Sequence, residues 1–128
     1  MIDKPSEQIS SFLNFVNAAQ SYYNFCDEEM HKQEALTQDY LHSLELDGLS
    51  CGERSKLATK LVINRKDRRY YKDRVEELEP IVRWASDPVN TKVINQLKQV
   101  LGACRKQENY HKDRTYTPKI LKENKNNE

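Results

Sequence analysis

Apolar residues recur along the first third of the chain at alternating intervals of four and three positions. They are Phe12, Val16, Ala19, Tyr23, Cys26, Met30, Tyr40 and Leu44. Polar Gln33 and Thr37 fill the two positions of the same spacing that lie between Met30 and Tyr40. All of these positions fall on one stripe of a helix, so the pattern predicts an α-helix over residues 6–45 with a coiled-coil-like seam.

A turn and a second seam follow. Asp47-Gly48 suits a helix end, because glycine readily adopts the left-handed conformation found there. Ser50 with Glu53 three positions later resembles a capping box, which predicts a second helix over residues 51–85. Its seam consists of Leu57, Leu61, Asn64, Arg68, Tyr71, Val75, Leu78 and Val82. Pro80 lies within this helix and predicts a kink or a restart, because proline lacks the amide hydrogen.

The segment Ser86-Asp87-Pro88 predicts that one helix stops and another starts. The third helix is expected over residues 88–109, with apolar positions at Val93, Ile94, Leu97, Val100, Leu101 and Cys104. Residues 111–128 are polar and predict a partly disordered tail. The predicted fold is all-α, with a helical bundle over residues 1–110 and an extended C-terminal tail. The bundle is a long antiparallel hairpin plus a shorter third helix, either a three-helix bundle or coiled-coil-like.

The short loop at residues 46–49 makes the first two helices antiparallel neighbours. If Leu44 faces Leu57, the polar interruptions of the two seams fall at one level, with Thr37 beside Asn64 and Gln33 beside Arg68. This predicted polar layer consists of Gln33, Thr37, Asn64 and Arg68. Such a layer either fixes register or oligomeric state, or forms the floor of a binding site, and both interpretations stay open.

A third helix that runs back along the hairpin from Asp87 would cover only about half of it. The leucines expected at the uncovered tip are Leu41, Leu44, Leu46, Leu49, Leu57 and Leu61. An uncovered apolar patch marks an interface, so the pattern predicts a homo-oligomer, in the first instance a dimer, paired through the hairpins. The alternative is a monomer whose Ile120-Leu121 segment covers the tip.

Charge is unevenly distributed along this 128-residue chain, although its formal net charge is only +1. Residues 1–50 carry two lysines and nine acidic residues, a net of −7, and residues 51–128 carry nineteen basic and eleven acidic residues, a net of +8. The asymmetry reflects either internal pairing of an acidic with a basic helix, or a basic face that meets an acidic partner.

The chain has no apolar run of ~20 residues and no signal-peptide pattern at its start. Its three cysteines, Cys26, Cys51 and Cys104, are widely spaced and form no C-x-x-C pair. Reduced thiols in a cytoplasm are therefore expected, with no membrane partner.

The segment RKDRRYYKDR, residues 65–74, holds six basic residues beside two aspartates and two tyrosines. With the third helix folded back, the basic and aromatic residues of the tail would converge on it. The candidate binding residues are Arg65, Arg68, Arg69, Tyr70, Arg105, Tyr110, Arg114 and Tyr116. Guanidinium groups with aromatic rings suit a nucleotide, a nucleic-acid strand or an acidic protein surface. Alternatively, these arginines pair internally with acids such as Glu28, Glu34 and Asp39.

Catalytic and metal chemistry find little support in the sequence. It has no glycine-rich phosphate loop, no G-x-S-x-G motif and no cysteine with an evident histidine partner. Glu28-x-x-His31 and Glu108-x-x-His111 have the spacing found in di-iron bundles, but their predicted levels disagree by roughly ten residues. We therefore expect a non-enzymatic protein without metal or cofactor.

Residues 54–121, with RKDRRYYKDRVEELEPIV and LGACRKQENYHKDRTYTPKIL, resemble small helical accessory proteins of phages and prophages of Gram-positive bacteria. The resemblance implies a viral protein that is made in the cytoplasm of a bacterial host cell and inhibits a host or defence factor. A sponge that sequesters a phosphorylated signalling nucleotide is the alternative. A nucleic-acid-binding accessory protein is a second alternative, which the sequence pI of about 7.7 does not favour.

Overall fold

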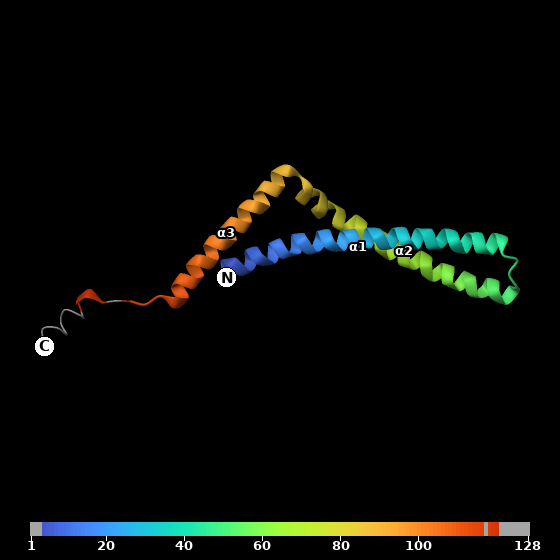
Figure 1. Ribbon diagram of the computed structural model, residues 1–128, viewed down its shortest axis with the longest axis horizontal. Helices are drawn as coiled ribbons and strands as arrows, with labels where there is room; N and C mark the ends of the chain where they lie inside the picture. The colour runs from blue at the N-terminus through green and yellow to red at the C-terminus, as the bar shows by residue number, and fades with distance from the viewer. Residues whose placement is uncertain (1–3, 117, 121–128) are drawn as a thin grey trace.

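The computed structural model describes residues 4–116 and 118–120, and over these residues it contains three long α-helices and no strand (Figure 1). They are α1 (Pro5–Leu46), α2 (Cys51–Ser86) and α3 (Pro88–Asp113). α1 and α2 lie side by side as an antiparallel hairpin, with their connecting loop at one end of the molecule. The prediction of an all-α fold is confirmed.

Local capping explains where α2 and α3 begin. The Ser50 side chain accepts a hydrogen bond from the Glu53 amide at 3.2 Å, and the Asp87 side chain accepts one from the Val89 amide at 2.9 Å. Gly48 in the connecting loop has a φ of 55°, which only glycine adopts without strain. The ends predicted for α1 and α2 are therefore correct to within one residue.

The predicted end of the third helix is wrong by four residues. α3 continues to Asp113 and so includes residues 111–113, which were assigned to the tail. Residues 114–116 leave the helix, and residues 119 and 120 are helical again. The other residues of the predicted tail, 117 and 121–128, lie outside the described residues.

α2 continues through Pro80 without a restart. Pro80 removes one backbone hydrogen bond, to the carbonyl of Glu76. Both residues lie on the exposed side of the helix, where water can replace the missing bond.

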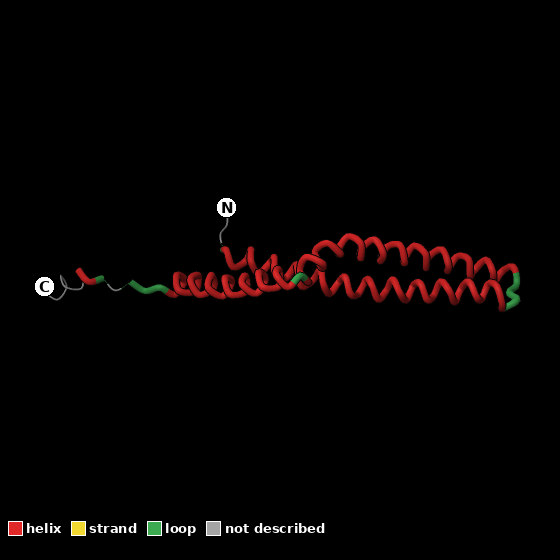
Figure 2. The backbone as a smooth tube through the Cα atoms, turned by 90° about the horizontal axis from the view of Figure 1, so that it is seen from above, coloured by secondary structure: helices red, strands yellow, loops and turns green. Residues whose placement is uncertain are grey.

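α3 does not run back along the hairpin, so that prediction is wrong. Figures 1 and 2 show it continuing from the end of α2 away from the hairpin tip, past the N-terminal end of α1. The Ser6 hydroxyl donates a hydrogen bond to Glu108 at 2.8 Å, which fixes the end of α3 beside the start of α1. The physical reason is the connection: Asp87 alone links α2 to α3, and an antiparallel helix pair needs about 2–5 linking residues.

The leucine tip is accordingly not covered by α3. Leu41 and Leu46 are 43% and 73% exposed, whereas Leu44, Leu49, Leu57 and Leu61 are half-buried within the hairpin. Residues 114–116 and 118–120 lie at the opposite end of the molecule, so they do not cover the tip (Figure 1). Of the Ile120-Leu121 segment named in the alternative, Ile120 therefore lies away from the tip, and Leu121 lies outside the described residues.

The core is thin. Its buried apolar residues are Leu13, Val16, Ala19, Cys26 and Leu101. The seams predicted for α1 and α2 face inward, except that Leu13 is buried where Phe12 was expected. The chain exposes 10248 Å², whereas a globular monomer of this mass exposes roughly 7100 Å². The elongated arrangement of the helices in Figure 2 agrees with this large exposed area.

Over the described residues, none of the helices carries a stretch that is apolar and long enough to cross a bilayer.

Candidate functional site

A buried polar layer joins the middle of α1 to the middle of α2. Asn64 is 3% exposed, and its amide nitrogen donates to the Gln33 carbonyl and to Gln33 Oε1, both at 2.8 Å. Thr37 is 5% exposed. Its hydroxyl lies 2.5 Å from Asn64 Oδ1 and 2.9 Å from the Gln33 carbonyl. Every hydrogen-bonding atom of the Asn64 side chain therefore has a partner, which offsets the cost of burying it. The predicted neighbours Thr37 and Asn64 are in direct contact.

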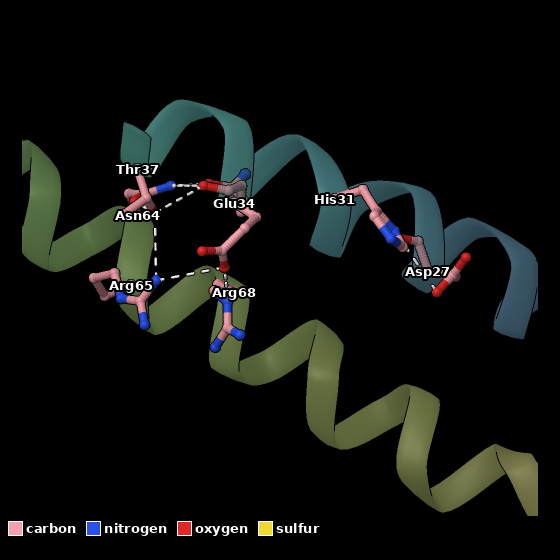
Figure 3. Close-up of polar contacts among 8 residues, drawn as sticks. Asp27, His31, Glu34, Thr37, Asn64, Arg65 and Arg68 are labelled. Atoms are coloured by element: carbon pink, nitrogen blue, oxygen red, sulfur yellow. Dashed lines mark hydrogen bonds and ion pairs between the residues drawn. The ribbon is translucent and has the colours of Figure 1, made fainter. Parts of the chain in front are cut away.

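A charged cluster borders this layer on one side of the hairpin (Figure 3). Arg68 Nε donates to Glu34 Oε2, and Arg65 Nη1 lies 3.6 Å from the same oxygen and 3.5 Å from the Thr37 hydroxyl. Arg68 was expected beside Gln33, and its ion pair is with Glu34. The alternative that the arginines pair internally with acids of the first helix is therefore confirmed for Arg65 and Arg68, both with Glu34. One carboxylate serves two guanidinium groups, so this side of α2 keeps an excess of positive charge.

The same side of α2 carries an open groove of about 510 Å³. Its lining residues are Leu61, Val62, Arg65, Lys66, Arg68 and Arg69. Among the residues that the structure describes, neither Lys66 nor Arg69 forms an ion pair. We call this set of six residues the basic groove. It combines an apolar strip, Leu61 and Val62, with four cations.

The predicted convergence of basic and aromatic residues is only partly found. Arg65, Arg68 and Arg69 share the basic groove, whereas Tyr70 lies about 140° around the helix axis from Arg65, on another face. The other four predicted binding residues lie at the far end of α3 or beyond it (Figure 1). These are Arg105, Tyr110, Arg114 and Tyr116. The reason is the direction of α3, which carries them away from the middle of α2.

An aromatic cluster that the sequence analysis missed lies on the Tyr70 side of the hairpin. Tyr22 stacks on Phe25, Phe25 meets Tyr71 edge-on, and Tyr70 meets Tyr71 edge-on, with ring centroids 5.3–6.3 Å apart. Arg74 lies 5.5 Å over the Tyr70 ring. The signal was present in the sequence: Phe15, Ala18, Tyr22 and Phe25 follow intervals of three, four and three beside the main seam.

We expect Tyr22 to ionise at a higher pH than an ordinary tyrosine. Its hydroxyl lies 3.2 Å from the Tyr70 hydroxyl, and this hydrogen bond is the largest cause that raises the pKa of Tyr22, ahead of Cys26 and burial. A raised pKa means that the contact stabilises the fold below the ordinary tyrosine pKa and loses its effect as the pH rises further. An NMR titration of ¹³Cζ-labelled tyrosine should show Tyr70→Phe lowering the pKa of Tyr22. The control Tyr110→Phe, at the far end of α3, should leave it unchanged; equal behaviour of the two variants would contradict the assignment.

The possible metal-binding residues are dispersed. His31 Nδ1 lies 2.7 Å from the Asp27 carbonyl and 3.7 Å from its carboxylate, on the outside of α1. Within residues 4–116 and 118–120, no three His, Cys, Asp or Glu side chains come together in a way that could hold a metal ion. Cys26 is buried, Cys104 half-buried and Cys51 exposed, each as a free thiol.

Comparisons of this chain with protein-family models, with curated proteins and with solved structures give no match.

Proposed function

We propose that this chain is a non-enzymatic binding protein that engages an acidic surface of another protein through the basic groove of α2. The observation that carries the proposal is the placement of four cations around exposed Val62 and half-buried Leu61. Among the described residues, Glu34 is the one carboxylate paired to these cations. Apolar side chains supply contact area, and the cations select a partner with carboxylates around its own apolar residues. An amphipathic helix with an acidic rim has this chemistry.

A protein partner fits the groove better than a free nucleotide does. A nucleotide sponge needs guanidinium groups around the phosphates and an aromatic ring against the base. The tyrosines and the second group of arginines lie elsewhere, as described above, and the groove is an open face of one helix. The groove likewise has no aromatic side chain on which the bases of a nucleic acid could stack.

Inhibition of a host or defence factor is the activity we propose for this binding. The resemblance of residues 54–121 to small phage and prophage proteins suggests it, and a protein without catalytic groups can inhibit simply by covering a partner's working surface. The basic groove lies within those residues.

A photo-cross-linking amino acid placed at Val62 in bacterial cells tests the proposal. Val62 is a half-exposed residue of the groove, and we expect a covalent adduct with a discrete protein. The position-matched control is Ile63, equally exposed but about 100° around the helix. An adduct that forms equally at both positions, or one that nuclease destroys, would contradict the proposal, and the latter would favour nucleic acid.

A charge reversal makes the test specific. Lys66→Glu with Arg69→Glu should abolish the Val62 adduct without unfolding the hairpin, because neither residue forms an ion pair within the described chain. Lys56→Glu with Lys60→Glu changes the net charge of the same helix equally, outside the groove, and should leave the adduct intact. Circular dichroism of both variants checks that the helices are retained.

A further inference from the structure

α3 carries two helical stripes, and the hairpin covers only one of them. The inner stripe, Ile94, Leu97, Leu101, Cys104 and Glu108, is buried or half-buried. The outer stripe is exposed and also follows strict intervals of four and three. Its members are Val89, Val93, Gln96, Val100, Ala103, Gln107 and Tyr110. The valines at 89, 93 and 100 and Tyr110 are 68%, 39%, 47% and 61% exposed. A regular heptad seam on the exposed side of a helix is typical of a helix that pairs with a second helix in a coiled coil.

The order of side chains along the outer stripe fits a second copy that runs antiparallel. The first heptad positions of the outer stripe are Val93, Val100 and Gln107. In an antiparallel pair, a residue at the first heptad position faces a residue at the fourth heptad position of the other helix. With Val100 facing the second copy's Ala103, Val93 faces the second copy's Tyr110. Gln96 then faces the second copy's Gln107, so the polar positions coincide, as Thr37 and Asn64 do inside the hairpin. A parallel pair would instead place the two bulky Tyr110 rings against each other.

Charge selects the same direction. In the antiparallel register Lys92 flanks the seam opposite the second copy's Asp113, which gives two symmetric ion pairs. A parallel pair would leave these charges at opposite ends of the dimer. The other charges of residues 88–107 are all basic, at Lys98, Arg105 and Lys106. Lys98 and Arg105 point away from the seam in this heptad frame.

We propose that the outer stripe of α3 is a homodimer interface, in which the α3 helices of two copies pair as an antiparallel coiled coil. The dimer would project its two hairpins in opposite directions. Each particle would then present two basic grooves, and so bind a repeated or oligomeric partner bivalently.

Paired cysteine variants test both the interface and its direction. Val93→Cys and Tyr110→Cys are made in separate chains in which Cys51 and Cys104 are replaced by serine and the buried Cys26 is retained. An oxidised mixture of the two chains should give a covalent heterodimer, and neither chain alone should cross-link. In the antiparallel pair two copies of residue 93 lie about 25 Å apart, far beyond disulfide reach. Covalent dimers of each chain alone, or none in the mixture, would overturn the proposal.

Mass in solution provides an independent test that does not depend on the function proposed above. The unmodified chain should have twice its mass of 15.1 kDa by light scattering, and Val100→Glu should halve that value. Val62→Glu introduces the same change at a similarly exposed valine in the basic groove and should leave the dimer intact while removing partner binding. A dimer that survives Val100→Glu, or a monomeric unmodified chain, would refute α3 pairing. Neither result would contradict the function proposed for the basic groove.

Discussion

Replacing Asn64 by aspartate is expected to destabilise the hairpin severely, although the two side chains have the same shape. Asparagine donates two hydrogen bonds to oxygen atoms of Gln33. A carboxylate has no hydrogen to donate and would place a negative charge against both oxygens in a buried position. We expect the free energy of unfolding at neutral pH to fall by about 3–5 kcal/mol, measured by urea denaturation with circular dichroism. Asn64→Ala removes the same bonds without burying a charge and should cost about 2 kcal/mol.

Two controls make this prediction specific to the polar layer. Asn95→Asp introduces the same charge at an exposed position of α3 and should change the free energy of unfolding by less than about 0.5 kcal/mol. Lower pH should partly restore Asn64→Asp, because burial favours the neutral carboxylic acid. Equal urea midpoints for the two aspartate variants would show that the polar layer contributes nothing to stability.

Replacing Leu101 by aspartate is expected to release α3 while the hairpin stays folded. Leu101 is the one buried residue that α3 contributes to the described core, where it packs into the small junction between α3 and the hairpin. A carboxylate there loses the apolar contact and meets no partner, a cost of about 3 kcal/mol or more. Amide hydrogen exchange in α3 should therefore accelerate by about two orders of magnitude. Exchange in the middle of α1 and α2 should hardly change.

The matched control is Lys98→Asp, which puts the same side chain on the exposed side of α3. It should leave exchange in α3 within a few-fold of the unmodified chain. If Leu101→Asp instead accelerates exchange equally in all three helices, the hairpin is not an independent unit and depends on α3 for its folding.

The sequence by itself determined the hairpin. Two seams with the same periodicity, a loop too short for anything but reversal, and the cap at Ser50 define two antiparallel helices and their register. Because the rise per residue is constant, the position of the loop determines which residues of the two helices lie opposite each other. For this reason the contact between Thr37 and Asn64 could be predicted from the loop, although Thr37 lies nine residues before the end of α1. The second stripe at Phe15, Tyr22 and Phe25 could also have been predicted from the sequence, but only one seam on this helix was considered.

Only the tertiary structure decided where α3 goes, and with it which candidate residues meet. Periodicity describes the faces of a helix but not the angle at which the next helix leaves it. That angle depends on the backbone at Asp87, where one extended residue with a φ of −64° and a ψ of 129° joins two helices. It also depends on the burial of Leu101 and on the hydrogen bond that Glu108 accepts from Ser6 at the start of α1. A small difference in two dihedral angles moves the end of a 26-residue helix by tens of ångströms. Arg105, Tyr110 and Arg114 consequently lie far from Arg68, and the outer stripe of α3 is left uncovered.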